Sequence, residues 1–229
     1  MIKFEKVNVM NFEGAIRGMR NPLDSWDKSD SLFYETADFD PTDFPGGFKF
    51  GENDLALAQR LIKAGSDHRK FLRQIFVSVD ITAPLYWWKE FDTYKVATVA
   101  NSCSTMHKIH AKEITLDDFS HEYLFNGVDN IEGNNDMEYY ENPTTCLEYL
   151  ISALNYHRKK YIETKDKRQW WQMIQLLPSS YNQKRTVTLN YETLRNIYGS
   201  RRNHKLDEWS VGFMAWIDSL PYAEELIKI

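Results

Sequence analysis

The residues best suited to hold a ligand lie at the end of one stretch of the chain, residues 83–107. This stretch begins with aromatic and apolar side chains that include one pair of charges, Lys89 and Glu90. It ends with hydroxyl and amide side chains, which are Asn101, Ser102, Ser104 and Thr105. Aromatic residues favour burial, and small polar groups beside them can form hydrogen bonds in a cleft. The pattern predicts a buried helix whose polar residues at its end line a cleft together with other parts of the chain.

A second polar group falls in a segment rich in turn-forming residues. Its members are Arg17, Arg20, Ser25 and Lys28. Such a group could form an anion site, but segments of this composition are more often solvated loops, and we expect a solvated loop here. His68 and His107 have no carboxylate, serine or cysteine partner at a spacing that supports catalysis. Neither histidine is therefore assigned a catalytic role.

The composition limits the class of protein. With 229 residues, of which 42% are hydrophobic, the chain can bury a real core, and we expect one domain over residues 1–229. It carries 28 Lys and Arg against 33 Asp and Glu. The resulting mild acidity does not favour binding to a nucleic-acid polymer.

Cysteine usage and the distribution of apolar residues exclude further classes. Cys103 and Cys146 are the only cysteines, and neither lies in a metal-ligand spacing, so we expect no disulfide framework and no metal site. No apolar run reaches the roughly 18 residues of a membrane span. The first residues also lack the apolar region of a signal peptide. We therefore expect a cytoplasmic protein with no membrane partner.

Hydrophobic periodicity predicts a mixed fold. Alternating apolar residues indicate strands at residues 2–9, 71–82 and 184–190. Apolar residues at helical spacing indicate helices at residues 54–64, 144–160, 167–177, 191–200 and 206–217, after a short helical turn at residues 11–18. Turn-forming residues indicate an ordered surface loop at residues 31–53 and an acidic loop or flap at residues 126–142.

Individual residues mark the ends and the buried sides of these elements. Gly65 suits the position after a helix, Pro178 stops the helix before it, and Thr115 and Asp118 can cap another turn. The expected buried side of the helix at residues 144–160 consists of Leu147, Leu150, Ile151, Leu154 and Tyr156. The expected buried side of the last helix consists of Trp209, Phe213, Trp216 and Ile217.

Four segments resemble the flavin-dependent thymidylate synthases in order and spacing. Residues 61–77 resemble that family's helix, glycine, histidine-containing loop and strand. Residues 83–95 are similar to an A-P-(I/L)-F helix that ends in an Arg-His-Arg triplet. Residues 98–107, T-V-A-N-S-C-S-T-M-H, resemble S-x-N-E-x-S-x-R-Y with one extra residue. The fourth segment resembles the family's C-terminal run. It contains Q-L-L-P, T-V-T-L-N and L-R-N-I-Y, followed by Arg201, Arg202 and Trp209.

The resemblance implies a fold, ligands and an assembly. The implied fold is α+β, like the thymidylate synthase-complementing proteins, with an antiparallel sheet, flanking helices and a helical segment. In that family a homotetramer holds FAD between subunits, dUMP lies under the flavin, and a one-carbon unit passes from methylenetetrahydrofolate to uracil. Methylenetetrahydrofolate and NADPH are further cofactors if this transferase reaction of nucleotide biosynthesis is retained.

The resemblance also implies candidate ligand-binding residues. Those expected to bind the cofactor are Tyr94, Lys95, Asn101, Asn190 and Asn196. Those expected to bind a pyrimidine nucleotide are Glu90, Ser104, Thr105, Arg201 and Arg202. The hydroxyl groups can donate to a phosphate, and an arginine can face a planar uracil. No catalytic residue is assigned, because the family needs no enzyme nucleophile.

Several positions depart from the family pattern. Thr93-Tyr94-Lys95 stands in place of the Arg-His-Arg triplet and keeps one cation. Other charged or basic family residues are replaced by Ser102, Met106, Ile174, Glu192 and Asn196. Glu90 occupies the position of a glutamine that contacts the nucleotide. A carboxylate there would repel a phosphate, which favours an altered substrate such as a cytosine-type nucleotide or a non-nucleotide ligand.

These departures leave two main hypotheses. The first is a homotetrameric flavoprotein that carries out FAD-dependent one-carbon and hydride transfer to a pyrimidine nucleotide, of the dUMP to dTMP type. The second is a catalytically degenerate homologue that acts as a nucleotide-binding or structural oligomeric protein. Without the resemblance, an α+β domain of unknown role remains.

Plain structural roles compete with ligand binding at several positions. Lys95 can complement a helix C-terminus, Ser104 can bond local backbone, and Arg201 and Arg202 can be a solvated pair. Tryptophans are more often core or subunit-interface residues than flavin-stacking ones, and we expect this of Trp87, Trp88, Trp170 and Trp171.

Overall fold

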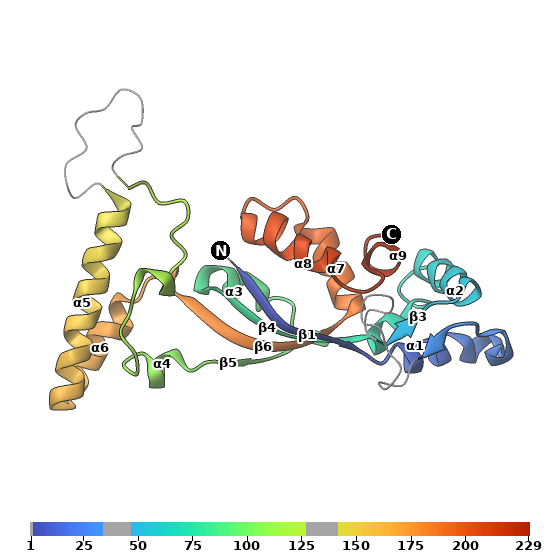
Figure 1. Cartoon of the computed structure of the whole chain (residues 1–229), viewed down its shortest axis with the longest axis horizontal. Helices are drawn as coiled ribbons and strands as arrows, with labels where there is room; N and C mark the ends of the chain where they lie inside the picture. Colours follow the sequence, from blue (N-terminus) through green and yellow to red (C-terminus); the bar gives the residue numbers. More distant parts are fainter. Residues whose placement is uncertain (1, 34–46, 127–141) are drawn as a thin grey trace, which may run out of the picture. The chain divides into compact units, whose positions relative to one another are not determined.

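The computed structural model describes residues 2–33, 47–126 and 142–229 (Figure 1). The described chain forms two compact units. The larger unit contains residues 2–81, 92–101 and 185–229, and the helical unit contains residues 82–91 and 102–184. The fold is α+β with an antiparallel sheet and flanking helices, which confirms the expected fold class. In the part of the chain described, no helix has the length and apolar character needed to cross a membrane.

A four-stranded antiparallel sheet has the strand order β1-β4-β6-β5. Its strands are β1 (Lys3–Met10), β4 (Phe76–Pro84), β6 (Asn182–Asn190) and β5 (Val99–Ser102). Val77, Val79 and Ile81 of β4 are buried, as their alternation predicts. The predicted strands at residues 2–9 and 184–190 are confirmed. The third is confirmed only from Phe76 onward, because residues 70–74 form a 3-10 helix, η3 (Lys70–Gln74).

The helices of the larger unit bury aromatic side chains against the sheet. They are α1 (Phe12–Arg20), α2 (Glu52–Lys63), α7 (Tyr191–Arg201), α8 (Met214–Asp218) and α9 (Ala223–Leu226), with a π-helical segment η6 (Glu208–Phe213) before α8. Phe4 of β1 stacks on Trp216 of α8 with ring centroids 4.7 Å apart. Trp209, Phe213, Trp216 and Ile217 are all buried, as predicted. Gly65, after α2, has a φ of 108°, a left-handed backbone that favours glycine.

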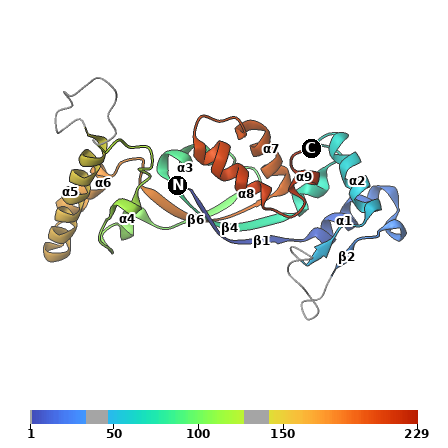
Figure 2. The ribbon, with the colours of Figure 1, turned by 45° about the horizontal axis from the view of Figure 1, so that its top comes forward.

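The helical unit has its own core. Its helices are α3 (Leu85–Phe91), α4 (Thr105–Lys108), η4 (Leu116–Asp118), α5 (Pro143–Thr164) and α6 (Lys167–Leu176). The long helices α5 and α6 lie side by side (Figure 1, Figure 2). Their core contains Ile109, Ile114, Phe119, Leu147, Leu154 and Met173.

The predicted elements of the helical unit are largely confirmed. The helix at residues 167–177 is present as α6, and Thr115 and Asp118 form the predicted capping box. The helix at residues 144–160 is present but continues to Thr164, where Lys165 takes a left-handed conformation. Tyr156 was wrongly placed on the buried side, because its side chain is 58% exposed.

The prediction of one helix over residues 83–107 is wrong. Ala83 and Pro84 end β4, and the helix that follows, α3, stops at Phe91. Trp87 and Trp88 are fully buried in α3 and pack against each other at 4.9 Å, so they are core residues as expected. Beyond α3 the chain turns and then forms β5 (Val99–Ser102), which pairs with β6 instead of continuing a helix.

Two predicted loops fall partly outside the described residues. Within the predicted loop 31–53, the strands β2 (Leu32–Phe33) and β3 (Phe48–Lys49) pair antiparallel, so the segment is not loop throughout. Residues 34–46 lie outside the described residues, as do residues 127–141 of the predicted acidic loop or flap 126–142.

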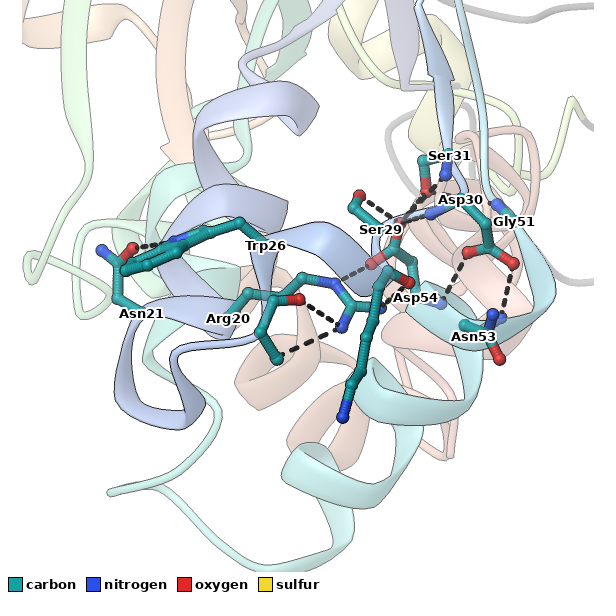
Figure 3. A network of polar contacts seen from close by, with 11 residues as sticks. Arg20, Asn21, Trp26, Ser29, Asp30, Ser31, Gly51, Asn53 and Asp54 are labelled. Carbon is teal, nitrogen blue, oxygen red and sulfur yellow. Dashed lines mark hydrogen bonds and ion pairs between the residues drawn. The ribbon is translucent and has the colours of Figure 1, made fainter.

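The solvated loop expected around Arg20 is instead an ordered segment folded over a buried ion pair (Figure 3). Short 3-10 helices, η1 (Asn21–Leu23) and η2 (Trp26–Lys28), follow α1. Arg20 is 4% exposed and donates from Nε to Asp54 at 2.5 Å, and its guanidinium also donates to the carbonyls of Ser25 and Lys28. These contacts exclude the alternative anion site for Arg20, because its charge is already neutralised.

The carboxylate of Asp54 is the centre of this network. It accepts hydrogen bonds from Ser29 Oγ at 2.8 Å, from the backbone N–H of Asp30 at 3.1 Å, and from Ser31 Oγ at 2.6 Å (Figure 3). Burial raises the pKa of Asp54, but the hydrogen bonds from Ser31, Ser29 and Arg20 outweigh burial, so its pKa lies below the usual carboxyl value.

The low pKa of Asp54 predicts a loss of stability in acid. A depressed carboxyl pKa contributes stability that is present above the unfolded-state pKa of about 3.9 and is lost as the pH falls through the folded value. We expect Asp54→Asn to be less stable than the parent at pH 7, with a difference that shrinks below about pH 4. Urea denaturation at several pH values measures it. A difference that stays constant down to pH 3 would show that ionised Asp54 is not the source.

Candidate functional site

A pocket of about 440 Å³ opens at the N-terminal end of α7 in the larger unit. We call it the α7 pocket. It is lined by Arg73, Thr93, Tyr94, Lys95, Val96, Ala97, Asn190, Glu192, Thr193 and Asn196. These residues come from η3, from the turn between α3 and β5, and from the start of α7. The pocket therefore brings together four of the five residues predicted to bind the cofactor: Tyr94, Lys95, Asn190 and Asn196.

Local hydrogen bonds explain why the start of α7 faces this turn. Asn190 is the N-cap of α7, and its side-chain oxygen accepts from the backbone N–H of Thr193 at 2.9 Å. The Asn190 amide also donates to the carbonyl of Arg73 at 3.3 Å. Thr193 Oγ1 donates to the carbonyl of Val96 at 3.3 Å, which ties the turn to the helix. Asn190 thus has a structural role in shaping the pocket wall.

The charges of the α7 pocket are divided between paired and unpaired groups. Glu192 is 8% exposed and accepts from Arg69 Nε at 2.9 and 3.1 Å, so its negative charge is compensated by the protein. Arg73 and Lys95 are exposed, and neither has a carboxylate partner among residues 2–33, 47–126 and 142–229. Two uncompensated cations beside a helix N-terminus favour an anionic ligand.

Arg201 holds one wall residue of the α7 pocket in position. It donates from Nε to the hydroxyl of Tyr94 at 2.7 Å, and its guanidinium carbon lies 5.6 Å from the Tyr94 ring centroid and 5.0 Å from that of Trp209. Arg202 instead lies 5.7 Å from the ring centroid of Tyr198. The two neighbouring arginines thus have different surroundings: Arg201 is partly buried against two aromatic rings, and Arg202 is exposed.

The remaining predicted residues lie elsewhere. Ser104 and Thr105 line a pocket of about 350 Å³ in the helical unit, together with Lys108, Lys112, Tyr181 and Gln183 among others. Ser104 accepts from the backbone N–H of His107 as the N-cap of α4, and Thr105 accepts from Gln183. Asn101 is exposed on β5, and Glu90 is partly exposed in α3, and neither lines either pocket.

Sequence reasoning did not single out two arginines at this site: Arg73, which lines the α7 pocket, and Arg69, which pairs with its wall residue Glu192. Both lie in the segment at residues 61–77 that carries part of the family resemblance, but their spacing shows no pattern of its own. Arg69 contacts Glu192, which is 123 positions away, so only the folded chain brings the two charges together. In the part of the chain described, no group of His, Cys, Asp and Glu side chains could hold a metal ion, and Cys103 and Cys146 form no disulfide bond.

Comparison with known proteins gives a likeness in structure and none in sequence. No protein-family model matches the chain, and no curated protein matches it in sequence. Thymidylate synthase X from Helicobacter pylori, solved with FAD and dUMP, shares the fold with a TM-score of 0.63 at 16% identity, over 99% of this chain and 96% of that chain. A second structure of a flavin-dependent thymidylate synthase from Helicobacter pylori, also complexed with FAD and dUMP, gives a TM-score of 0.62 at 16% identity, over 97% and 98% of the two chains.

Proposed function

We propose that the protein is a divergent flavin-dependent thymidylate synthase-like enzyme. It binds FAD and a pyrimidine nucleotide, and it transfers a one-carbon unit and a hydride to that nucleotide in a reaction of the dUMP to dTMP type. The observation that carries this proposal is a fold shared over nearly the whole chain with structures that contain FAD and dUMP, combined with the cationic α7 pocket.

The residues of the α7 pocket fit the phosphate part of a flavin nucleotide. A pyrophosphate carries several negative charges, and Arg73 and Lys95 offer two cations that no described carboxylate neutralises. The N-terminal end of α7 adds a favourable dipole. A volume of about 440 Å³ accommodates part of FAD, and we assign the rest of the cofactor to neighbouring subunits of a homotetramer.

Bound FAD would supply hydride chemistry, and the chain's own residues would bind and orient the ligands. In this proposal Arg73 and Lys95 neutralise the cofactor phosphates, and Asn196 offers an amide at the pocket edge. Arg201 acts as a positioning residue through Tyr94. Ser104 and Thr105 have hydroxyl groups that can donate to the phosphate of the pyrimidine nucleotide.

A catalytically degenerate homologue, which binds a nucleotide or only supports an oligomer, is the second candidate. The specific observation in its favour is the partly buried Arg69–Glu192 pair. Glu192 replaces an arginine of the family pattern, and its charge is neutralised within the protein. Met106 and Ile174 likewise put apolar side chains where the pattern has arginine.

A visible absorption spectrum and a native mass of the purified protein test the proposal, followed by an assay of dUMP-dependent oxidation of reduced flavin. We expect a flavin spectrum, a tetramer mass and dUMP-dependent oxidation. Protein that is colourless and takes up neither added FAD nor FMN would contradict flavin binding. If the protein binds flavin but the reduced flavin is not oxidised when any pyrimidine nucleotide is added, the result supports the degenerate homologue instead.

A further inference from the structure

The helical unit contains a second cationic pocket, of about 320 Å³, whose lining residues are given no ligand-binding role in the proposed function. It is lined by Met106, His107, His110, Tyr161, Lys165, Lys167 and Trp170. These residues come from α4 and the turn after it, from the end of α5 and from the start of α6. We call it the α5–α6 pocket. None of its lining residues, all within the described chain, is acidic.

The two lysines of the α5–α6 pocket lack the ion pairs that their neighbours have. Lys160 pairs with Glu163 at 2.9 Å, and Arg168 pairs with Asp166 at 2.7 Å, so the carboxylates that flank the pocket in sequence are already occupied. Lys165 and Lys167 have no carboxylate partner in the described chain. Each instead lies near an aromatic ring, with Lys165 Nζ 5.8 Å from the Tyr161 centroid and Lys167 Nζ 6.0 Å from that of Trp171.

Backbone geometry keeps the two lysines on either side of one short turn. Lys165 has a left-handed backbone, with a φ of 56°, as the residue that ends α5. Asp166 is the N-cap of α6, and its side chain accepts from the backbone N–H of Arg168, so α6 begins with Lys167. A solvated lysine pair would be the ordinary result at such a turn. Here, however, both lysines line one concave site with two histidines.

His110 adds an imidazole ring to the wall of the pocket. Its ring packs edge-on against Tyr161 at 5.0 Å, and its Nδ1 is buried without a hydrogen-bond partner among the described residues. The backbone carbonyl of His110 accepts from Arg158 Nε of α5 at 3.1 Å, which holds the turn after α4 against α5.

Trp170 gives the pocket an aromatic wall. Its Nε1 donates to the carbonyl of Met106 at 2.9 Å, so the polar edge of the indole is satisfied and α6 is joined to α4. The ring also packs against Trp171 at 4.8 Å. With its polar edge satisfied, the indole contributes apolar and π-stacking surface to a ligand.

From these features we propose that the α5–α6 pocket binds a small organic phosphate that carries a planar ring. Two lysines and the histidines match a phosphate dianion, and Trp170 and Met106 match an apolar ring. The volume is at the lower end for small-molecule pockets, which suits one ring and one phosphate. This site stands independently of flavin binding at the α7 pocket, because it shares no residue with it.

Calorimetric titration of the full chain with phenyl phosphate, inorganic phosphate and phenol tests this site. We expect phenyl phosphate to bind more tightly than either fragment. The Lys165→Gln/Lys167→Gln variant should weaken it by about tenfold or more, because charge-assisted hydrogen bonds are lost. Lys159→Gln/Lys160→Gln makes the same charge change on α5 outside the pocket and should leave the affinity within about twofold.

The outcomes separate this site from other cationic surfaces. Equal weakening in both lysine variants would mean nonspecific attraction to a positive surface and would overturn the proposal. The proposal would also be overturned if phenyl phosphate did not bind at all. It would likewise be overturned if binding were lost in Arg73→Gln/Lys95→Gln but kept in Lys165→Gln/Lys167→Gln. A far-ultraviolet circular dichroism spectrum identical to the parent's excludes unfolding of either variant as the cause of lost binding.

Discussion

Replacing Asp54 with alanine is expected to lower the free energy of unfolding by about 3 kcal/mol or more, the effect of breaking a buried ion pair. The carboxylate is fully buried and neutralises Arg20, which is itself 4% exposed. Removing it leaves a buried guanidinium without its counter-charge. It also removes the acceptor for Ser29 and Ser31, so the segment that follows α1 loses its anchor on α2. Urea denaturation at pH 7 measures the change.

Glu13→Ala is the matched control for Asp54. Glu13 also pairs with an arginine, Arg17, but the two side chains are about two-thirds exposed and 3.8 Å apart. An exposed pair of this kind contributes about 0.5 kcal/mol or less. A loss below about 1 kcal/mol in Asp54→Ala would mean that the Arg20–Asp54 pair is no more important than a surface pair. The double variant Arg20→Met/Asp54→Leu should recover part of the loss, because no buried charge remains.

Replacing both Arg73 and Lys95 with glutamine is expected to weaken FAD binding by about 100-fold, at roughly tenfold for each charge-assisted contact. These residues are the two cations of the α7 pocket without a carboxylate partner in the described chain. Glutamine keeps much of the side-chain length and removes the charge. Both side chains are exposed, so the free energy of unfolding should change little. Flavin fluorescence during titration with FAD measures the affinity.

Arg60→Gln/Lys63→Gln removes the same charge from exposed positions on α2 that do not line the α7 pocket. We expect this control to bind FAD within about twofold of the parent at physiological salt. If the control weakens binding as much as the Arg73→Gln/Lys95→Gln variant, the α7 pocket is not the cofactor site. Flavin binding that survives unchanged in Arg73→Gln/Lys95→Gln would lead to the same conclusion.

Elements with a clear local pattern could be predicted from the sequence. The alternation of Val77, Val79 and Ile81 identified β4, and the spacing of Leu147 and Leu154 identified α5. Such patterns survive folding because one side of each element must face a core. The resemblance to the flavin-dependent thymidylate synthases gave the α+β fold class correctly, since order and spacing of elements reflect the fold even where identity is low.

The stretch at residues 83–107 marks where local pattern failed. Its aromatic run indicated helix, and α3 is indeed helical to Phe91. What the run could not show is that Val99 to Ser102 pair with β6, a strand that follows about eighty residues later. Strand pairing depends on a partner that is distant in sequence. The aromatic run at the start of the stretch therefore could not predict the strand at its end.

The sequence by itself determined most of the elements of this protein, the fold class and the residue types that gather at the start of α7. Only the tertiary structure decided which charges are available for a ligand. Arg20 forms an ion pair with Asp54, and Glu192 forms one with Arg69. The cations without a carboxylate partner in the described chain are Arg73, Lys95, Lys165 and Lys167. The physical reason is that the partners of these ion pairs are far apart in the chain, by 34 positions for Arg20 and Asp54 and by 123 for Arg69 and Glu192. Contacts over such separations produce no periodic pattern in the sequence.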